Sequence, residues 1–153
     1  MKLRIAAGIV TVAVVLVTLT TDVFAAQSKE VVGNWITVDD NDGEKTSILK
    51  MWEKNGKLYG KVVRLLAPET PNPVCSECRG KNRDKPIEGM TILWGVTERD
   101  GGEWWEGGYI LDPENGKVYR VKIRTIQGGS RLEVRGYLGV SLSGRTQIWE
   151  RAK

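Results

Sequence analysis

Turn-forming dipeptides divide the chain at short intervals, and this spacing constrains the fold more than any other feature. Five of them favour tight β-hairpins and a sixth is weaker: Asp42-Gly43, Asn55-Gly56, Asp100-Gly101, Asn115-Gly116, Gly128-Gly129 and Ser143-Gly144. The β-rich runs between them predict eight strands, at about 31–38, 46–53, 58–66, 90–97, 104–111, 117–126, 131–138 and 145–151. Connections this short join antiparallel neighbours, so we expect an all-β antiparallel domain.

The alternation of side chains within these runs predicts one buried and one wet face. In the sixth run, Val121 and Ile123 alternate with Arg120, Lys122 and Arg124. After the N-terminal segment, no run of the sequence repeats its apolar residues with the 3.6-residue period of a helix. Parallel strands need a crossover connection, usually a helix, so a parallel sheet is disfavoured. We expect an eight-stranded up-and-down barrel, whose interior is either filled by side chains or able to hold one small ligand.

The first 25 residues have the features of an export signal. Lys2 and Arg4 precede a mostly apolar run over residues 5–21, and a small-residue cleavage site ends at Ala25. An uncleaved anchor in the inner membrane is the alternative, although the run is short and diluted by threonines. We expect a signal peptide at 1–25 and a single domain at 26–153, located in the periplasm or secreted and not integral to the membrane.

One connection, between residues 66 and 90, is far longer than a hairpin requires. It contains four of the five prolines and both cysteines. Export favours a disulfide between Cys75 and Cys78, with a redox pair or half of a metal site as alternatives. Because the chain has no His and no third Cys, only carboxylates could complete a zinc site, and we predict neither metal nor cofactor.

Three basic and three aromatic side chains are candidates for binding a ligand. They are Arg79, Lys81 and Arg83 for an anionic group, and Tyr59, Trp94 and Trp104 for stacking or apolar contact. The competing interpretations are a solvated charged loop for the cations and core packing for the rings.

The absence of His also removes the usual base for a Ser or Cys nucleophile, so we do not expect an enzyme. Asp112 and Asp84 remain as carboxylates that a hydrolase or lyase could use. The acidic turn at 39–44 does not fit a calcium loop and is interpreted as a solvated hairpin turn. A formal net charge of +4 is too small an excess to indicate nucleic acid binding.

Seven motifs, in order along the chain, resemble a bacterial family called domain of unknown function 2147. They are Gly33-Asn34-Trp35, Gly56-Lys57-Leu58-Tyr59-Gly60-Lys61, Cys75-x-x-Cys78-x-Gly80, Pro86-Ile87-x-Gly89-Met90, Gly108-x-Ile110-Leu111-Asp112-Pro113-x-x-Gly116-Lys117-x-Tyr119, Arg135-Gly136-Tyr137 and Gly144-Arg145-Thr146-Gln147-x-Trp149-x-Arg151. The resemblance implies an exported bacterial envelope protein with a lipocalin-like barrel, and it implies no catalytic residue.

The first motif is also similar to the start of lipocalins, in which a Gly-x-Trp on the first strand is covered by a late basic residue. Here Trp35 could be covered by Arg151 or Arg145, and we expect Arg151. The leading functional hypothesis is an envelope barrel that binds a small amphipathic or anionic ligand. The alternatives are a filled barrel that presents Trp104-Trp105 to a protein partner, and a carboxylate-dependent enzyme.

Overall fold

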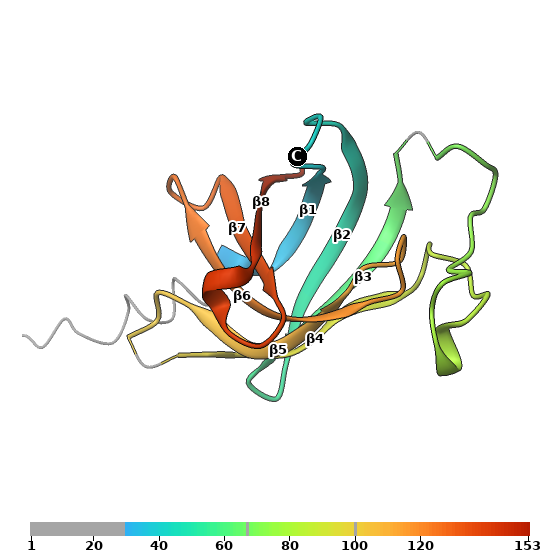
Figure 1. Ribbon diagram of the computed structural model, residues 1–153. Helices are drawn as coiled ribbons and strands as arrows, with labels where there is room; N and C mark the ends of the chain where they lie inside the picture. The colour runs from blue at the N-terminus through green and yellow to red at the C-terminus, as the bar shows by residue number, and fades with distance from the viewer. Residues whose placement is uncertain (1–29, 67, 100) are drawn as a thin grey trace, which may run out of the picture.

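The computed structural model describes residues 30–66, 68–99 and 101–153, and the expected signal peptide with its cleavage site lies outside these ranges. The described chain forms one closed antiparallel barrel in which each strand pairs with its neighbours in sequence (Figure 1). The strands are β1 (Gly33–Val38), β2 (Lys45–Lys54), β3 (Lys57–Leu65), β4 (Thr91–Glu98), β5 (Trp105–Leu111), β6 (Val118–Ile126), β7 (Arg131–Tyr137) and β8 (Arg145–Arg151). The eight-stranded up-and-down barrel expected from the turn spacing is confirmed.

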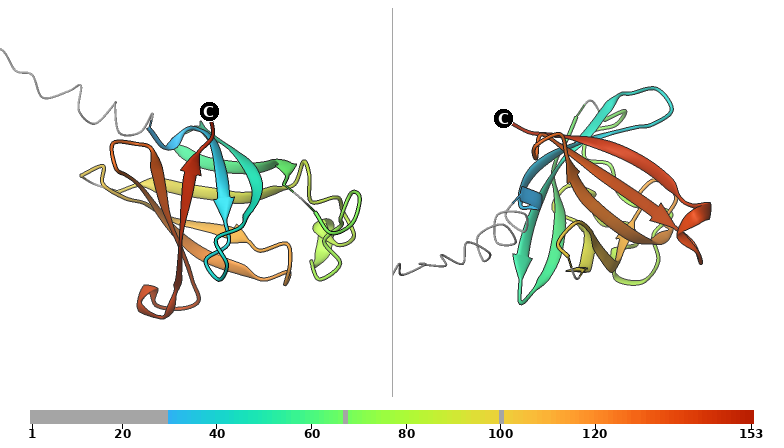
Figure 2. Two further views of the ribbon diagram at one scale, coloured as in Figure 1. Left: turned by 90° about the horizontal axis from the view of Figure 1, so that it is seen from above. Right: turned by 90° about the vertical axis from the view of Figure 1, so that its left-hand side faces the viewer.

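Pairing between the first and last strands closes the barrel, with Trp35 opposite Arg151 and Ile36 opposite Glu150. The connections after β1, β3, β5 and β7 lie at one end, which we call the open end. The connections after β2, β4 and β6 lie at the other, the closed end (Figure 2).

Apolar side chains fill the barrel toward its closed end. Trp35, Leu49, Leu93 and Ile123 come from four different strands and are fully shielded from solvent. Gly60 belongs to this packing because a Cβ there would lie 3.0 Å from Leu49 Cδ2. The alternation predicted for β6 is confirmed, since its Val and Ile side chains at 121 and 123 are buried.

The long connection between β3 and β4 lies at the open end, beside the turn between β5 and β6 (Figure 1). It contains one 3-10 turn, η1 (Gly80–Asn82), and the disulfide Cys75–Cys78. Within the described ranges, no helix has the length and apolar character that crossing a membrane requires.

Candidate ligand-binding cavity

A cavity of about 420 Å³ opens at the open end of the barrel, where the side-chain packing of the closed half stops. Its inner wall is apolar and is built by strands from all round the barrel. The apolar lining includes Val62, Ile92, Ile110, Val134 and Trp149. A cavity of this size and character is in the range that proteins use to enclose small molecules.

Three hydroxyl groups form a polar patch on the wall contributed by β1 and β2. Thr37 Oγ1 lies 2.7 Å from Thr46 Oγ1 and 2.7 Å from Ser47 Oγ, so the three side chains hydrogen-bond to one another. Thr37 and Ser47 are buried, and all three residues line the cavity. Because a hydroxyl both donates and accepts, this patch can serve either kind of ligand group.

The inward face of β8 runs from the mouth of the cavity to the closed end. Arg145, Gln147, Trp149 and Arg151 are spaced by two, and the first three line the cavity. Gln147 joins two of its neighbours, since its Oε1 accepts a 3.0 Å hydrogen bond from Trp149 Nε1 and its Nε2 donates to Asp40 Oδ1 at 3.2 Å. The strand thus carries polar groups at the mouth and an aromatic ring below them.

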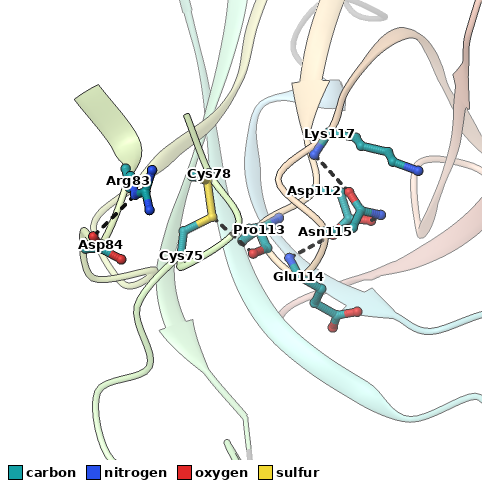
Figure 3. The surroundings of a disulfide bond; sticks show 9 residues. All are labelled: Cys75, Cys78, Arg83, Asp84, Asp112, Pro113, Glu114, Asn115 and Lys117. Carbon is teal, nitrogen blue, oxygen red and sulfur yellow. Dashed lines mark hydrogen bonds and ion pairs between the residues drawn. A yellow bond between two sulfur atoms is a disulfide. The ribbon is translucent and has the colours of Figure 1, made fainter. Parts of the chain in front are cut away.

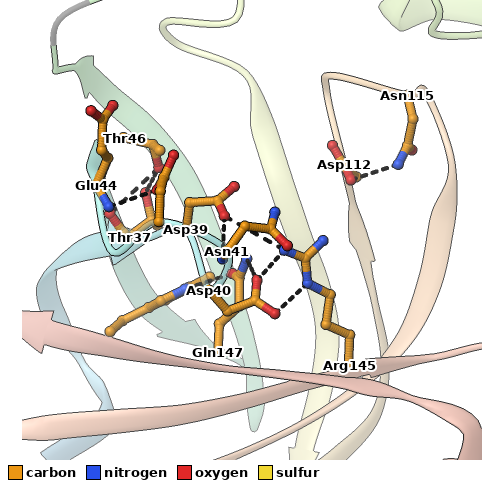
Figure 4. A network of polar contacts seen from close by, with 12 residues as sticks. Thr37, Asp39, Asp40, Asn41, Glu44, Thr46, Asp112, Asn115, Arg145 and Gln147 are labelled. Atoms are coloured by element: carbon orange, nitrogen blue, oxygen red, sulfur yellow. Dashed lines mark hydrogen bonds and ion pairs between the residues drawn. The ribbon is translucent and has the colours of Figure 1, made fainter.

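The turn between β1 and β2 is fastened to β8 at the mouth (Figure 4). Arg145 Nε donates a 2.5 Å hydrogen bond to Asp40 Oδ2, and Arg145 Nη2 lies 3.6 Å from Asp39 Oδ1. The hydrogen bond from Arg145 is the main reason that the pKa of Asp40 is lowered. Because the guanidinium already has two carboxylate partners, its charge is largely neutralised before any ligand arrives.

The turn between β5 and β6 adds more acidic groups to the mouth. Asp112 shapes this turn, because its carboxylate accepts hydrogen bonds from Glu114 N at 3.0 Å and from Asn115 Nδ2 at 2.7 Å. Partial desolvation, followed by the charges of Asp112 and Asp39, raises the pKa of Glu114. The charged lining therefore consists of Asp39, Asp112 and Glu114 against the single cation Arg145, which makes the mouth acidic.

The disulfide loop supports this turn from outside the cavity (Figure 3). Both cysteines are buried, and Cys75 Sγ lies 3.1 Å from the carbonyl oxygen of Pro113. Gly116 makes the close approach possible, because it has φ +67° and a Cβ there would lie 2.0 Å from the Glu77 carbonyl oxygen. The loop thus positions the rim that carries the acidic groups.

The aromatic residues selected from the sequence lie on the outer surface of the barrel. Tyr59 stacks on Trp52 with ring centroids 5.8 Å apart, and Trp94 stacks on Tyr109 at 6.0 Å. The side-chain period placed them there, since Tyr59 alternates with the inward Leu58 and Gly60 of β3.

Trp104 precedes β5 and packs beneath two cations. Lys122 Nζ and Arg124 Cζ each lie 4.4 Å from the centroid of its ring, so two charged side chains cover the indole. Trp105, its neighbour, points inward and is almost completely buried. The Trp104-Trp105 pair therefore divides between the two faces of the sheet, as adjacent strand residues do.

The basic residues selected from the sequence, Arg79, Lys81 and Arg83, are exposed on the disulfide loop. Arg83 Nε lies 3.7 Å from Asp84 Oδ2 at the surface. Arg79 borders a hollow between the loop and the β5–β6 turn, together with Lys117. The cavity lining includes none of the six ligand-binding candidates from the sequence. The sequence did contain a signal for the residues that line the cavity. Arg145, Gln147 and Trp149 alternate along β8 in step with Arg151, so they face the same side of the strand as that residue.

Arg151 covers the closed end of the barrel, whereas Arg145 lies at the mouth. The Arg151 guanidinium carbon is 4.2 Å from the centroid of the Trp35 ring. Its nitrogens donate to three backbone carbonyl groups, those of Gly129 at 2.6 Å, Val32 at 3.3 Å and Glu30. The contact expected between the first strand and a late Arg is thus accompanied by hydrogen bonds to two separate segments.

The closed antiparallel barrel, filled at one end, hollow at the other and capped by an Arg over a first-strand Trp, has a lipocalin-like fold. The chain belongs to the bacterial family described as "Uncharacterized protein conserved in bacteria (DUF2147)", which matches residues 33–151. Protein HP1028 from Helicobacter pylori, described as belonging to the lipocalin family, has a similar structure. The TM-score is 0.68 with 22% sequence identity, over 80% of this chain and 82% of that one. No curated protein matches the chain.

Proposed function

We propose that this protein binds a small amphipathic molecule in the cavity at the open end. The observation that carries the proposal is the cavity itself, about 420 Å³ with an apolar wall, three linked hydroxyl groups and an acidic mouth. An apolar portion of a ligand would lie against Val134 and Trp149, and its polar end would remain at the mouth. Structural similarity to a lipocalin-family protein supports the fold in which such a cavity occurs.

The charges at the mouth favour a polar end that is cationic or rich in hydrogen-bond donors. Asp39, Asp112 and Glu114 line the mouth, and Arg145 is already paired with acidic partners. A ligand cation would relieve the repulsion between these carboxylates, whereas an anion would add to it. The proposal therefore keeps the amphipathic ligand expected from the sequence. It replaces the anionic group also considered there with a head group that is cationic or rich in hydrogen-bond donors.

Calorimetric titration with three single-chain amphiphiles below their micellar concentrations tests this proposal. Dodecyltrimethylammonium, dodecyl maltoside and dodecyl sulfate share one tail and differ in head-group charge. We expect affinity to decrease in that order. Tight binding of the sulfate and weak binding of the ammonium compound would contradict the assigned head group, and no binding of any of the three would contradict the cavity proposal.

A size series at Gly136 tests whether the cavity is the binding site. Gly136 lines the cavity, and a Cβ there would lie 3.6 Å from Tyr119 Cβ, an ordinary contact. Gly136→Ala should therefore bind nearly as well as the wild type, while Gly136→Leu should fill the space and lose most of the affinity. Tyr59→Leu on the outer surface is the control. Loss of binding in the control, with retention in Gly136→Leu, would place the site outside the barrel.

The two other hypotheses receive less support from the geometry. The ring of Trp105 is buried and that of Trp104 is covered by cations, so this hairpin does not present a bare aromatic surface to a partner. Both carboxylate oxygens of Asp112 hydrogen-bond within their own turn, and Asp84 is exposed beside Arg83. Neither carboxylate has the surroundings of a catalytic acid or base.

We also propose that the protein is exported and that residues 1–25 are removed. The disulfide supports this proposal, because such bonds persist in oxidising compartments. Intact mass of the protein recovered from the exported fraction should correspond to a chain that begins at Ala26. Recovery of the full-length chain in the membrane fraction would instead indicate an N-terminal anchor.

A further inference from the structure

The loop between β7 and β8 displays the most exposed large apolar side chains in the described part of the protein. Leu142 is 91% exposed, Val140 67% and Leu138 58%. Leu142 lies within the short 3-10 turn η2 (Ser141–Ser143), and the other two precede it. In Figure 2 (left) this dark red loop projects away from the barrel. Single exposed apolar residues are common, but three within five residues at one loop tip indicate a contact surface.

The loop backbone is held in place, so the exposure of these side chains follows from a defined conformation. Arg135 Nη2 donates a 3.1 Å hydrogen bond to the Leu142 carbonyl oxygen, and Ser143 N donates to Val140 O at 3.3 Å. Gly144 lies against the preceding strand, where a Cβ would be 2.6 Å from the Gly136 carbonyl oxygen. These contacts hold the backbone against the barrel while the side chains of Val140 and Leu142 remain exposed.

Positive charges surround the base of the loop on its β6 side. Val118, 43% exposed, extends the apolar surface, and it borders the same hollow as Leu138, Lys117 and Arg79. Arg120 lies beside the loop, opposite Tyr137 in the register of β6 and β7. Glu77 also borders the hollow.

Among the residues that the structure describes, these three cations, at 79, 117 and 120, have no ion-pair partner. Exposed apolar side chains with unpaired cations on one side match a surface with an apolar interior and negative head groups.

The loop also forms part of the cavity rim, because Tyr137, Leu138 and Ser143 line the cavity. We propose that the loop between β7 and β8 docks on an anionic lipid bilayer, with Val140 and Leu142 inserted among the head groups and the neighbouring cations on the surface. The rim formed by this loop would then lie at the bilayer, with the acidic groups of the mouth to one side of the contact, and an amphipathic ligand could pass between cavity and bilayer without crossing bulk water. The docking stands on the loop alone, while the ligand exchange rests on the proposed function.

Vesicle flotation tests the docking with the protein as recovered from the exported fraction. Vesicles of phosphatidylglycerol with phosphatidylethanolamine are compared with vesicles of phosphatidylcholine. We expect binding to the anionic vesicles that weakens at high salt, and little binding to the neutral ones. Val140→Ser/Leu142→Ser should reduce binding at least tenfold, while Val63→Ser, which removes a 39% exposed side chain from β3 on the opposite wall, should leave it unchanged.

Charge variants and the oligomeric state complete the test. Lys117→Gln/Arg120→Gln should lower binding to anionic vesicles and reduce its salt dependence. Absence of wild-type binding, or equal losses in the loop variant and Val63→Ser, would overturn the docking. A wild-type dimer that becomes a monomer in Val140→Ser/Leu142→Ser would assign the loop to a second copy of the chain and overturn it as well.

The same variants separate docking from ligand binding. In solution without vesicles, Val140→Ser/Leu142→Ser should bind dodecyltrimethylammonium as the wild type does. Gly136→Leu should lose the amphiphile and still float with anionic vesicles. A protein that floats but binds no amphiphile would overturn the proposed function and the exchange, whereas one that binds the amphiphile and does not float would overturn the docking alone.

Discussion

Removal of the Arg151 side chain should destabilise the barrel far more than removal of Arg145, although both come from the inward face of β8. The Arg151 guanidinium lies 4.2 Å from the centre of the Trp35 ring and donates to three backbone carbonyl groups. The carbonyls belong to the β6–β7 turn and to the segment before β1, so one side chain ties together two parts of the closed end.

The magnitude follows from these contacts. A hydrogen bond from a charged donor contributes about 1.5 to 3 kcal/mol when buried, and about 1 kcal/mol is appropriate at this half-buried position, where water can replace part of it. The contact with the Trp35 ring adds about 0.5 to 1 kcal/mol. Arg151→Ala should thus lower the free energy of unfolding by about 3 to 4 kcal/mol, and Arg151→Lys, which retains the charge over the ring, by about half as much.

Arg145→Ala is the matched control, because its side chain is 54% exposed and its acidic partners are also accessible. Exposed ion pairs contribute less than about 1 kcal/mol, so the control should remain close to the wild type. Urea denaturation followed by tryptophan fluorescence and by circular dichroism measures all three variants. Equal losses for Arg145→Ala and Arg151→Ala, or a loss below about 1 kcal/mol for the latter, would refute the reasoning.

Three further predictions concern the disulfide, the mouth and the buried indoles. Replacing Cys75 and Cys78 with Ser should leave a folded barrel that is less stable by about 2 kcal/mol in denaturant titration, because the ring closed by the bond is small; global unfolding would contradict this. Because the folded-state pKa of Glu114 is raised, its ionised form opposes folding. In thermal melts at neutral pH, Glu114→Gln should therefore be more stable than the wild type. This difference should disappear when the pH falls below the ordinary Glu pKa. Trp35→Phe should cost more stability than Trp105→Phe by about 1 to 2 kcal/mol, because Trp35 Nε1 donates to Val31 O at 2.9 Å while the buried Trp105 Nε1 has no acceptor among the described residues; equal losses in denaturant titration would argue against it.

The strands and their order could be predicted because their causes are local. A turn such as Asn55-Gly56 needs only its own backbone conformations, and both residues have positive φ in the structure. The inward and outward faces of β6 follow from the two-residue period of a strand.

The candidate site could be predicted only in part. Large aromatic and basic side chains were selected for their chemistry, yet Tyr59 and Trp94 stack with partners on the outer surface. The residues that do line the cavity include Thr37, Ser47 and Gln147, whose types are common at any surface. The two-residue period of the strands already indicated that these side chains face the interior. The sequence did not indicate how far along the barrel axis the packed core extends.

The sequence by itself determined the number of strands, their antiparallel order and the long cysteine-containing connection, since each depends on residues that are close along the chain. Only the tertiary structure decided which end of the barrel is filled and which charge the mouth carries. Arg145 and Asp40 are 105 residues apart in sequence, and they meet because β1 and β8 close the barrel. Closure brings side chains from distant strands to one level of the interior, and the volumes and charges that meet there decide where a cavity remains.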